Sequence, residues 1–205
     1  MARQRAVFLD RDGVINVDHG YVHKIEHFRF VPGSDVAMAR LQAAGWRLVV
    51  VTNQAGLARG LYSIDDYERF TAHLRQQLAA AGVQLDAVLH CPHLPDAAVD
   101  AYRLACNCRK PGPGMLLRAA RELSLDMPAS VIVGDRLSDV LAGRAAGVGH
   151  GVLVRSGHAL DPADAQRADA VYDDLAAFAD AWLSRDADSV SSPRDGPQID
   201  PAARG

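Results

Sequence analysis

Five short apolar runs, rich in β-branched residues, recur along the chain, and each stops at a loop or at the start of a helical pattern. They cover residues 6–9, 48–51, 87–89, 131–133 and 152–154. Because the runs are continuous rather than alternating, they are typical of strands buried on both faces. Between them, apolar periodicity predicts helices over residues 35–44, 64–81, 115–123 and 138–146. Alternating strands and helices predict an α/β fold with a doubly wound, Rossmann-like parallel sheet.

Two segments fit neither pattern and are predicted to be loops. Residues 16–30 are polar and histidine-rich, and residues 91–108 contain two prolines and all three cysteines. Long loops in compact domains are more often functional than idle. From residue 184 onward Ser, Asp, Pro and Gly dominate. We therefore expect one domain over residues 1–184, without a separate cap domain, and a disordered tail over residues 185–205.

Composition narrows the class of protein. The chain has 205 residues, 49% hydrophobic and 23% charged, with a formal net charge of −3. This length suits one well-buried domain, and the slightly acidic balance disfavours nucleic acid or a membrane surface as partner. No apolar run is long enough to span a bilayer, and the N-terminal one is too short for a signal peptide. We expect a monomer in the cytoplasm.

The first strand ends in a pair of acids, Asp10-Arg-Asp12, followed by Gly13. Two carboxylates so close repel each other unless a cation or a shared proton compensates. Mg²⁺ is the natural candidate, because it is a hard ion that prefers oxygen ligands. The alternative is a plain strand-ending turn, since Asp-Gly is a common turn dipeptide.

Three further segments place suitable chemistry at strand ends. Thr52-Asn-Gln54 follows the second run, Arg109-Lys110 precedes a helix, and Gly-Asp135-Arg136 follows the fourth run, with Asp139 three residues further on. Carboxyl ends of parallel strands meet at one edge of a sheet, where α/β proteins bind ligands. Hydroxyl, amide and cationic groups there can bind phosphate oxygens, so the four segments together predict a phosphate site.

The cysteines form a separate candidate site. Cys91-Pro-His93 and Cys106-Asn-Cys108 offer three thiolates and one imidazole, a full tetrahedral set for structural Zn²⁺. The one-residue spacing departs from the usual Cys-x-x-Cys, and unconnected buried thiols are the alternative. Such a site would stiffen the loop that presents Arg109 and Lys110.

The order Asp-x-Asp-Gly-Val, Thr-Asn, Lys and Gly-Asp-x-x-x-Asp resembles the haloacid dehalogenase-like phosphatases over residues 7–154. The resemblance implies Asp10 as nucleophile and Asp12 as general acid/base. It implies Mg²⁺ held by Asp10, by the Asp12 carbonyl and by Asp135. Thr52 and Lys110 would steady the transferring phosphoryl group, and Asp139 would orient its neighbours.

Finer motifs, among them Cys106-Asn-Cys-Arg-Lys-Pro111, resemble a zinc-loop subgroup that removes one phosphate from a heptose bisphosphate. The implied substrate is therefore a small sugar bisphosphate, a precursor of bacterial surface polysaccharide. The one departure is Gly112, where the subgroup leads us to expect histidine. The implied substrate contacts are Asp18, His19, Gly20, Tyr21, Thr52, Asn53, Gln54, Ala55, Arg109, Lys110 and Arg136.

Other functions share parts of this pattern. Histidinol-phosphate phosphatases have the same signature and a similar zinc loop, and nucleic-acid 3′-phosphatases share Thr-Asn-Gln. A non-catalytic, zinc-stabilised phosphate-binding module is the alternative from another class. Asp12, two residues beyond the nucleophile, favours turnover over a passive acidic pocket. The remaining histidines, His158 among them, are expected to be surface or packing residues.

Overall fold

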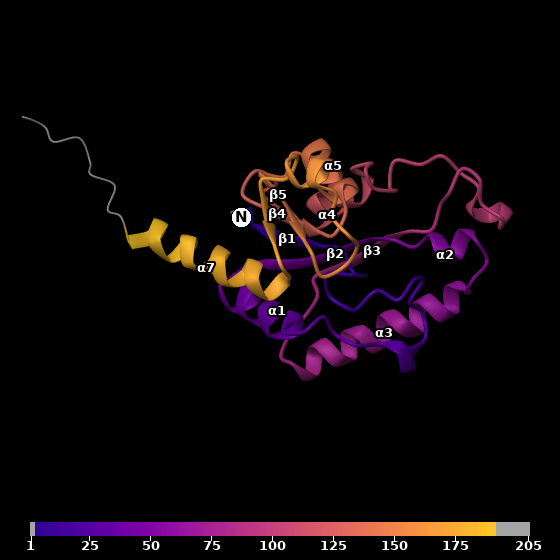
Figure 1. Cartoon of the computed structure of the whole chain (residues 1–205), viewed down its shortest axis with the longest axis horizontal. Coiled ribbons are helices and arrows are strands. Elements are labelled where there is room, and N and C mark those ends of the chain that lie inside the picture. Colours follow the sequence, from indigo (N-terminus) through magenta and orange to yellow (C-terminus); the bar gives the residue numbers. More distant parts are fainter. Residues whose placement is uncertain (1–2, 192–205) are drawn as a thin grey trace, which may run out of the picture.

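The computed structural model describes residues 3–191, with side chains through residue 185. Its centre is one parallel sheet in the order β3-β2-β1-β4-β5-β6 (Figure 1). The strands are β1 (Ala6–Leu9), β2 (Arg47–Asn53), β3 (Ala87–Cys91), β4 (Val131–Gly134), β5 (His150–Val154) and β6 (Ala170–Tyr172). The predicted doubly wound α/β fold is confirmed. All the named strands in residues 3–191 belong to this sheet, and no separate cap domain interrupts it.

The helices connect the strands. They are α1 (Ser34–Ala43), α2 (Ala55–Ala58), α3 (Ile64–Ala80), α4 (Gly114–Leu123), α5 (Leu137–Ala146), α6 (Pro162–Ala165) and α7 (Leu175–Ser191), with 3-10 turns η1 (Ile25–His27) and η2 (Asp100–Tyr102). Each of the four predicted helices is present, with ends within one residue of those expected. At the start of α3, Ser63 and Asp66 form a capping box, which satisfies backbone N–H groups that the first turn leaves free.

The sheet is covered on both faces, as Figure 1 shows, with α1, α3 and α7 on one side and α4 and α5 on the other. Side chains of β1 alternate between two cores. Val7 and Leu9 join Phe70 of α3 in one core, while Phe8 joins Leu116 of α4 in the other. All these side chains are fully buried, so the packing on both faces fixes the position of β1 and of the residues that follow it.

The C-terminal boundary differs from the prediction. Helix α7 runs to Ser191, so residues 185–191 are helical rather than part of a disordered tail. Phe178 is fully buried, and Trp182 packs edge-on against Trp46 with ring centroids 6.2 Å apart. This packing anchors α7, although its second half has the polar sequence that predicts disorder. Residues 192–205 lie outside the described range. Within residues 3–191, no helix is both long and apolar enough to cross a membrane.

The topology determines where a ligand can bind. Strand β1 lies between β2 and β4, so the connections from β1 and β4 diverge to opposite halves of the sheet. A crevice opens at the carboxyl ends of the strands at such a switch point. The residues predicted to carry the chemistry lie at or just beyond the carboxyl ends of β1, β2 and β4.

Candidate active site

Asp10 directly follows β1 and lies beside a buried lysine. Lys110 Nζ is 3.2 Å from Asp10 Oδ1 and 2.5 Å from Asp139 Oδ1, and it donates to the Val51 carbonyl at 2.7 Å. Burial raises the pKa of Asp10 to about 6, against the opposing charge of Lys110. Burial alone would lower the pKa of Lys110, but Asp10 and Asp139 outweigh it and the pKa is raised. Lys110 therefore remains a cation beside Asp10.

Asp135 follows β4 and has one oxygen without a protein partner. Its Oδ2 accepts from the His158 backbone N–H at 3.0 Å and lies 2.6 Å from His158 Nδ1. Its Oδ1 is buried with no hydrogen bond from the described residues. Burial raises the pKa of Asp135, as it does for Asp10. A buried, unpartnered carboxylate oxygen costs free energy unless a ligand satisfies it.

The carboxylates of Asp10, Asp135 and Asp139 offer oxygens within 4.8 Å of one another. Such a cluster, with the free Oδ1 of Asp135, fits a hard divalent cation such as Mg²⁺. Gly13 allows this approach, because its φ is 82° and a Cβ there would lie 2.7 Å from Asp135 Oδ2.

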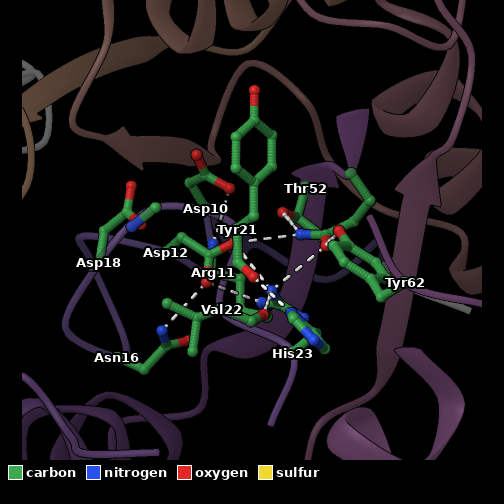
Figure 2. A network of polar contacts seen from close by, with 12 residues as sticks. Asp10, Arg11, Asp12, Asn16, Asp18, Tyr21, Val22, His23, Thr52 and Tyr62 are labelled. Atoms are coloured by element: carbon green, nitrogen blue, oxygen red, sulfur yellow. Dashed lines mark hydrogen bonds and ion pairs between the residues drawn. The ribbon is translucent and has the colours of Figure 1, made fainter. Parts of the chain in front are cut away.

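Asp12 points into a different set of partners, drawn in Figure 2. Its Oδ1 accepts from Arg11 Nε at 3.1 Å and from Asn16 Nδ2 at 3.0 Å. Its Oδ2 accepts from Arg11 Nη2 at 2.9 Å and from Gln54 Nε2 at 3.1 Å. The Asp12 side chain is 20% exposed and so reaches the cavity, while the buried Arg11 balances its charge.

The end of β2 is tied to the segment that carries Lys110. Asn53 Nδ2 donates to the Lys110 carbonyl at 3.1 Å, and the Lys110 N–H donates to Asn53 Oδ1 at 3.0 Å. Thr52 Oγ1 accepts from Gln54 Nε2 at 2.9 Å. The reciprocal Asn53–Lys110 pair positions Lys110 against the sheet although no strand connects them.

These groups surround a cavity of about 550 Å³. Four cations face its acids, namely Arg59, Arg109, Lys110 and Arg136. The predicted residues that line it are Asp10, Asp12, Asp18, Gly20, Tyr21, Thr52, Asn53, Gln54, Ala55, Arg109, Lys110, Asp135 and Arg136. His19 is the predicted contact that does not line it; it lies by a shallower depression with Glu26, His27 and Arg29.

Four lining residues were not predicted: Arg59, Tyr62, Ser138 and His158. His158 was expected to be a surface or packing residue. It contacts Asp135 and Arg136 instead, because the loop after β5 returns to the same edge of the sheet. In the sequence, the signal for a place at the site is that His158 follows the fifth predicted strand.

Residues 91–108, which we call the Cys/His loop, bring four side chains together. Cys91 Sγ lies 3.5 Å from Cys106 Sγ and 3.1 Å from Cys108 Sγ, and His93 Nδ1 lies 3.3 Å from Cys108 Sγ. The ligand atoms of a tetrahedral zinc with bonds of about 2.3 Å to sulfur lie roughly 3.5–3.8 Å apart. The cluster therefore fits one zinc ion, and all three cysteines are free.

Gly112 follows this loop at a crowded position. A Cβ there would lie 2.4 Å from the Asn107 carbonyl oxygen and 2.8 Å from that of Arg109. A side chain would therefore collide with the loop backbone as it stands. The departure from the expected histidine thus has a local steric reason.

An acid pair after the first strand, a hydroxyl at the end of the second and an acid after the fourth, with a lysine beside the first acid, define a phosphatase of the haloacid dehalogenase-like class. The model of the HAD-hydrolase-like family matches residues 107–178. The structure is similar to a D,D-heptose 1,7-bisphosphate phosphatase from B. bronchiseptica solved with magnesium and phosphate. The TM-score is 0.75, with 36% identity, 88% of this chain and 99% of that one covered.

Two curated relatives are closer in sequence. D-glycero-β-D-manno-heptose-1,7-bisphosphate 7-phosphatase of Photorhabdus laumondii is 48% identical over 83% of this chain and 91% of its own length. The protein of that name in Escherichia coli K12 is 50% identical over 83% of this chain and 90% of its own length. The chain belongs to this family of heptose-bisphosphate 7-phosphatases.

Proposed function

We propose that the chain hydrolyses the 7-phosphate of D-glycero-D-manno-heptose 1,7-bisphosphate and leaves the 1-phosphate in place. The observation that carries this is Asp10, a buried carboxylate 3.2 Å from Lys110 at the floor of a cavity rich in arginine. The names and identities of the curated relatives support the substrate.

In the first step an oxygen of Asp10 attacks phosphorus and the bond from phosphorus to the sugar oxygen breaks. Asp12 gives its proton to that departing oxygen. Lys110 and Thr52 bind the phosphoryl oxygens, whose charge must be stabilised as the bonds change, and electrostatic stabilisation and positioning supply most of the catalysis in phosphoryl transfer. The product is an aspartyl-phosphate and a free sugar hydroxyl.

In the second step Asp12 takes a proton from water, and the water oxygen attacks phosphorus. The bond between phosphorus and Asp10 breaks, which releases phosphate and restores both carboxyl groups. Dividing hydrolysis into two transfers is the usual advantage of a carboxylate nucleophile.

Mg²⁺, when bound, would neutralise charge on the carboxylates and on the phosphoryl group. We propose Asp10, Asp135 and the backbone carbonyl of Asp12 as its protein ligands, and the free Asp135 Oδ1 supports this assignment. We propose that Asp139 is not a ligand but orients Lys110 through their ion pair.

We also propose structural Zn²⁺ at Cys91, His93, Cys106 and Cys108. Four protein ligands leave no open position, so this ion would organise the loop rather than take part in the reaction. We also propose a monomer as the working unit.

The phosphate that is not cleaved needs a cation at the mouth of the cavity. Arg109 and Arg136 both line it, and we propose that they bind this group, while Asp18, Gly20, Tyr21 and residues 53–55 contact the rest of the substrate. Arginine suits the role because its fork can contact two phosphate oxygens at once.

A screen with Mg²⁺ tests the proposal. Heptose 1,7-bisphosphate, simple sugar monophosphates and histidinol phosphate are compared by phosphate release, and phosphorus NMR identifies which phosphate remains. We expect the bisphosphate to give the highest kcat/KM and to yield the 1-phosphate. Preferred turnover of histidinol phosphate would move the assignment to the rival activity, and absence of any phosphate release would favour the binding module.

A further inference from the structure

Arg11, which separates the two acids of the motif, is the largest fully buried side chain of the described residues. It is 1% exposed, and its guanidinium carbon lies 4.6 Å from the centroid of the Phe70 ring in α3. Charged side chains are almost never fully buried unless they are paired. The partner of Arg11 therefore indicates why this arginine is buried.

The partner of Arg11 is Asp12. The Nε and Nη2 atoms of Arg11 form a fork onto the two carboxylate oxygens, at 3.1 and 2.9 Å. The fork leaves one acceptor site on each oxygen, and Asn16 and Gln54 donate there when Asp12 is ionised. One of these two amides must withdraw when Asp12 carries its proton, whereas the fork can remain. The geometry thus holds Asp12 at both oxygens and in one orientation.

Arg11 also connects Asp12 to two walls of the cavity. Its Nη2 donates to the Val22 carbonyl at 2.9 Å, and Val22 follows the cavity residue Tyr21. It donates to Gln54 Oε1 at 3.2 Å, an oxygen that also accepts from the Tyr62 hydroxyl at 2.6 Å. These contacts form the network in Figure 2.

We propose that Arg11 is a positioning residue that orients Asp12 for proton transfer and couples it to the loop of residues 17–30. The inference rests on the proposed function, because it needs Asp12 to be the general acid/base. Arg11 itself touches no reacting atom through its side chain. It fixes the direction from which Asp12 reaches the departing oxygen and, later, the water.

The consequences differ between the two steps. A sugar hydroxyl is a poor leaving group and needs the proton of Asp12, whereas p-nitrophenolate departs without one. The attack of water on the aspartyl-phosphate needs Asp12 with either substrate. Misplacing Asp12 therefore slows both steps for a sugar phosphate but only the second step for p-nitrophenyl phosphate.

The test uses Arg11→Lys, which keeps the charge and loses the fork, with exposed Arg118→Lys on α4 as matched control. Rapid mixing with p-nitrophenyl phosphate and Mg²⁺ should give a burst of about one p-nitrophenol per enzyme in Arg11→Lys, followed by slow turnover. Acid quenching should trap the phosphoenzyme. General acid–base catalysis contributes about 10²–10⁴-fold, so a loss on the order of 10–100-fold is expected for a misplaced Asp12. Arg118→Lys should match the wild type.

A double-mutant cycle separates positioning from a structural role. Arg11→Lys in an Asp12→Asn background should change the single-turnover rate by less than about threefold, because residues that act through one another are not additive. An equal loss in both backgrounds, or an unchanged kcat in folded Arg11→Lys, would overturn the proposal.

If Arg11→Lys lacks a cooperative thermal transition, Tyr62→Phe decides alone. It removes the hydroxyl that orients Gln54, and we expect a smaller burst than in Arg11→Lys. In the Asp12→Asn background, where the burst is already complete, Tyr62→Phe should cause no further change. Folded Tyr62→Phe without a burst would then refute the coupling. Failure of the proposed mechanism is distinguishable, because it would appear as retained activity in Asp10→Asn.

Discussion

The catalytic edge of the sheet and the Cys/His loop both gather polar side chains, but different forces hold them. Asp10 and Asp135 extend from β1 and β4, whose residues are fully buried and hydrogen-bonded along their length. The Cys/His loop starts from the end of β3, and its cysteines pack against the core under α4. Its outer part contains one 3-10 turn and a small apolar cluster in which Leu94 and Ala97 meet Ala58. The sheet therefore preorganises the first region, whereas the outer part of the loop depends more on its four ligand side chains.

The two regions meet at Arg109 and Lys110. Lys110 is fastened to β2 through Asn53, and Arg109 Nη1 lies 3.5 Å from the His93 carbonyl in the loop. Lys110 is thus held by the sheet, and its neighbour Arg109 is held by the Cys/His loop. The proposed chemistry follows this division, because it assigns the cleaved phosphate to Lys110 and the retained one to Arg109.

The sharpest break between the regions should come from Asp10→Asn. An amide is not a nucleophile, so turnover should fall by more than about 10³-fold, while zinc content stays at the wild-type level. The metal-free variant should melt no lower than the wild type, because burial already disfavours the charge of Asp10. Phosphate release, metal analysis and thermal unfolding measure the three effects. Activity within tenfold of wild type would contradict the mechanism.

The substitution Cys108→Ser should affect the Cys/His loop and spare the sheet, because it removes one proposed zinc ligand. Zinc should be lost, and the Cys/His loop should become sensitive to protease. The main thermal transition should persist, because the sheet does not need the loop. Activity on the bisphosphate should fall roughly 10–100-fold, because the loop positions Arg109, while Lys110 stays held through Asn53. Exposed Ser184→Ala on α7 is the control, and retention of zinc would remove the basis of the prediction.

Arg109→Ala tests the junction. Loss of a charged hydrogen-bonding contact costs about 1.5–3 kcal/mol, so kcat/KM for the bisphosphate should fall roughly 10–150-fold. A monophosphate lacks the second group and should lose far less. Steady-state kinetics on both substrates measures the difference, and equal losses would argue against a phosphate contact.

The smallest effect concerns pH and the metal-free protein. The pKa of Asp10 is raised from its usual 3.8 to about 6, and that of Asp135 is raised too. The folded state therefore binds protons more tightly than the unfolded one, and this contribution to stability is lost as pH rises through about 6. Unfolding by urea should show metal-free protein gaining stability between pH 7 and pH 5. Mg²⁺ at pH 7 should reduce the difference, and stability that rises with pH over this window would contradict the assignment.

Much of the fold could be predicted because buried parallel strands leave continuous apolar runs. Strand β6 was missed because Ala170–Tyr172 is three residues long, only partly buried and flanked by aspartates. Helix α7 was missed because its apolar part, residues 175–183, is rich in alanine and gives a weak periodic pattern. Packing against α1 and the sheet identifies its buried side.

Most site residues were predictable because motifs fix their place at strand ends. Arg11 was not assigned a role, since a lone arginine in a sequence indicates exposure and only tertiary contacts reveal its burial. His158 was missed because no motif marks the loop after β5. His19 was included with its neighbours, although alternate residues of an extended loop face different ways.

The Asn53–Lys110 pair has a consequence for protein engineering. Two side-chain hydrogen bonds hold the lysine's peptide as a neighbouring strand would, so the anchor of this proposed catalytic residue is local to residues 53 and 110. The intervening Cys/His loop can then be treated as an interchangeable cassette. A grafted loop that ends in the same Arg-Lys-Pro could present new groups to a substrate while the lysine keeps its place.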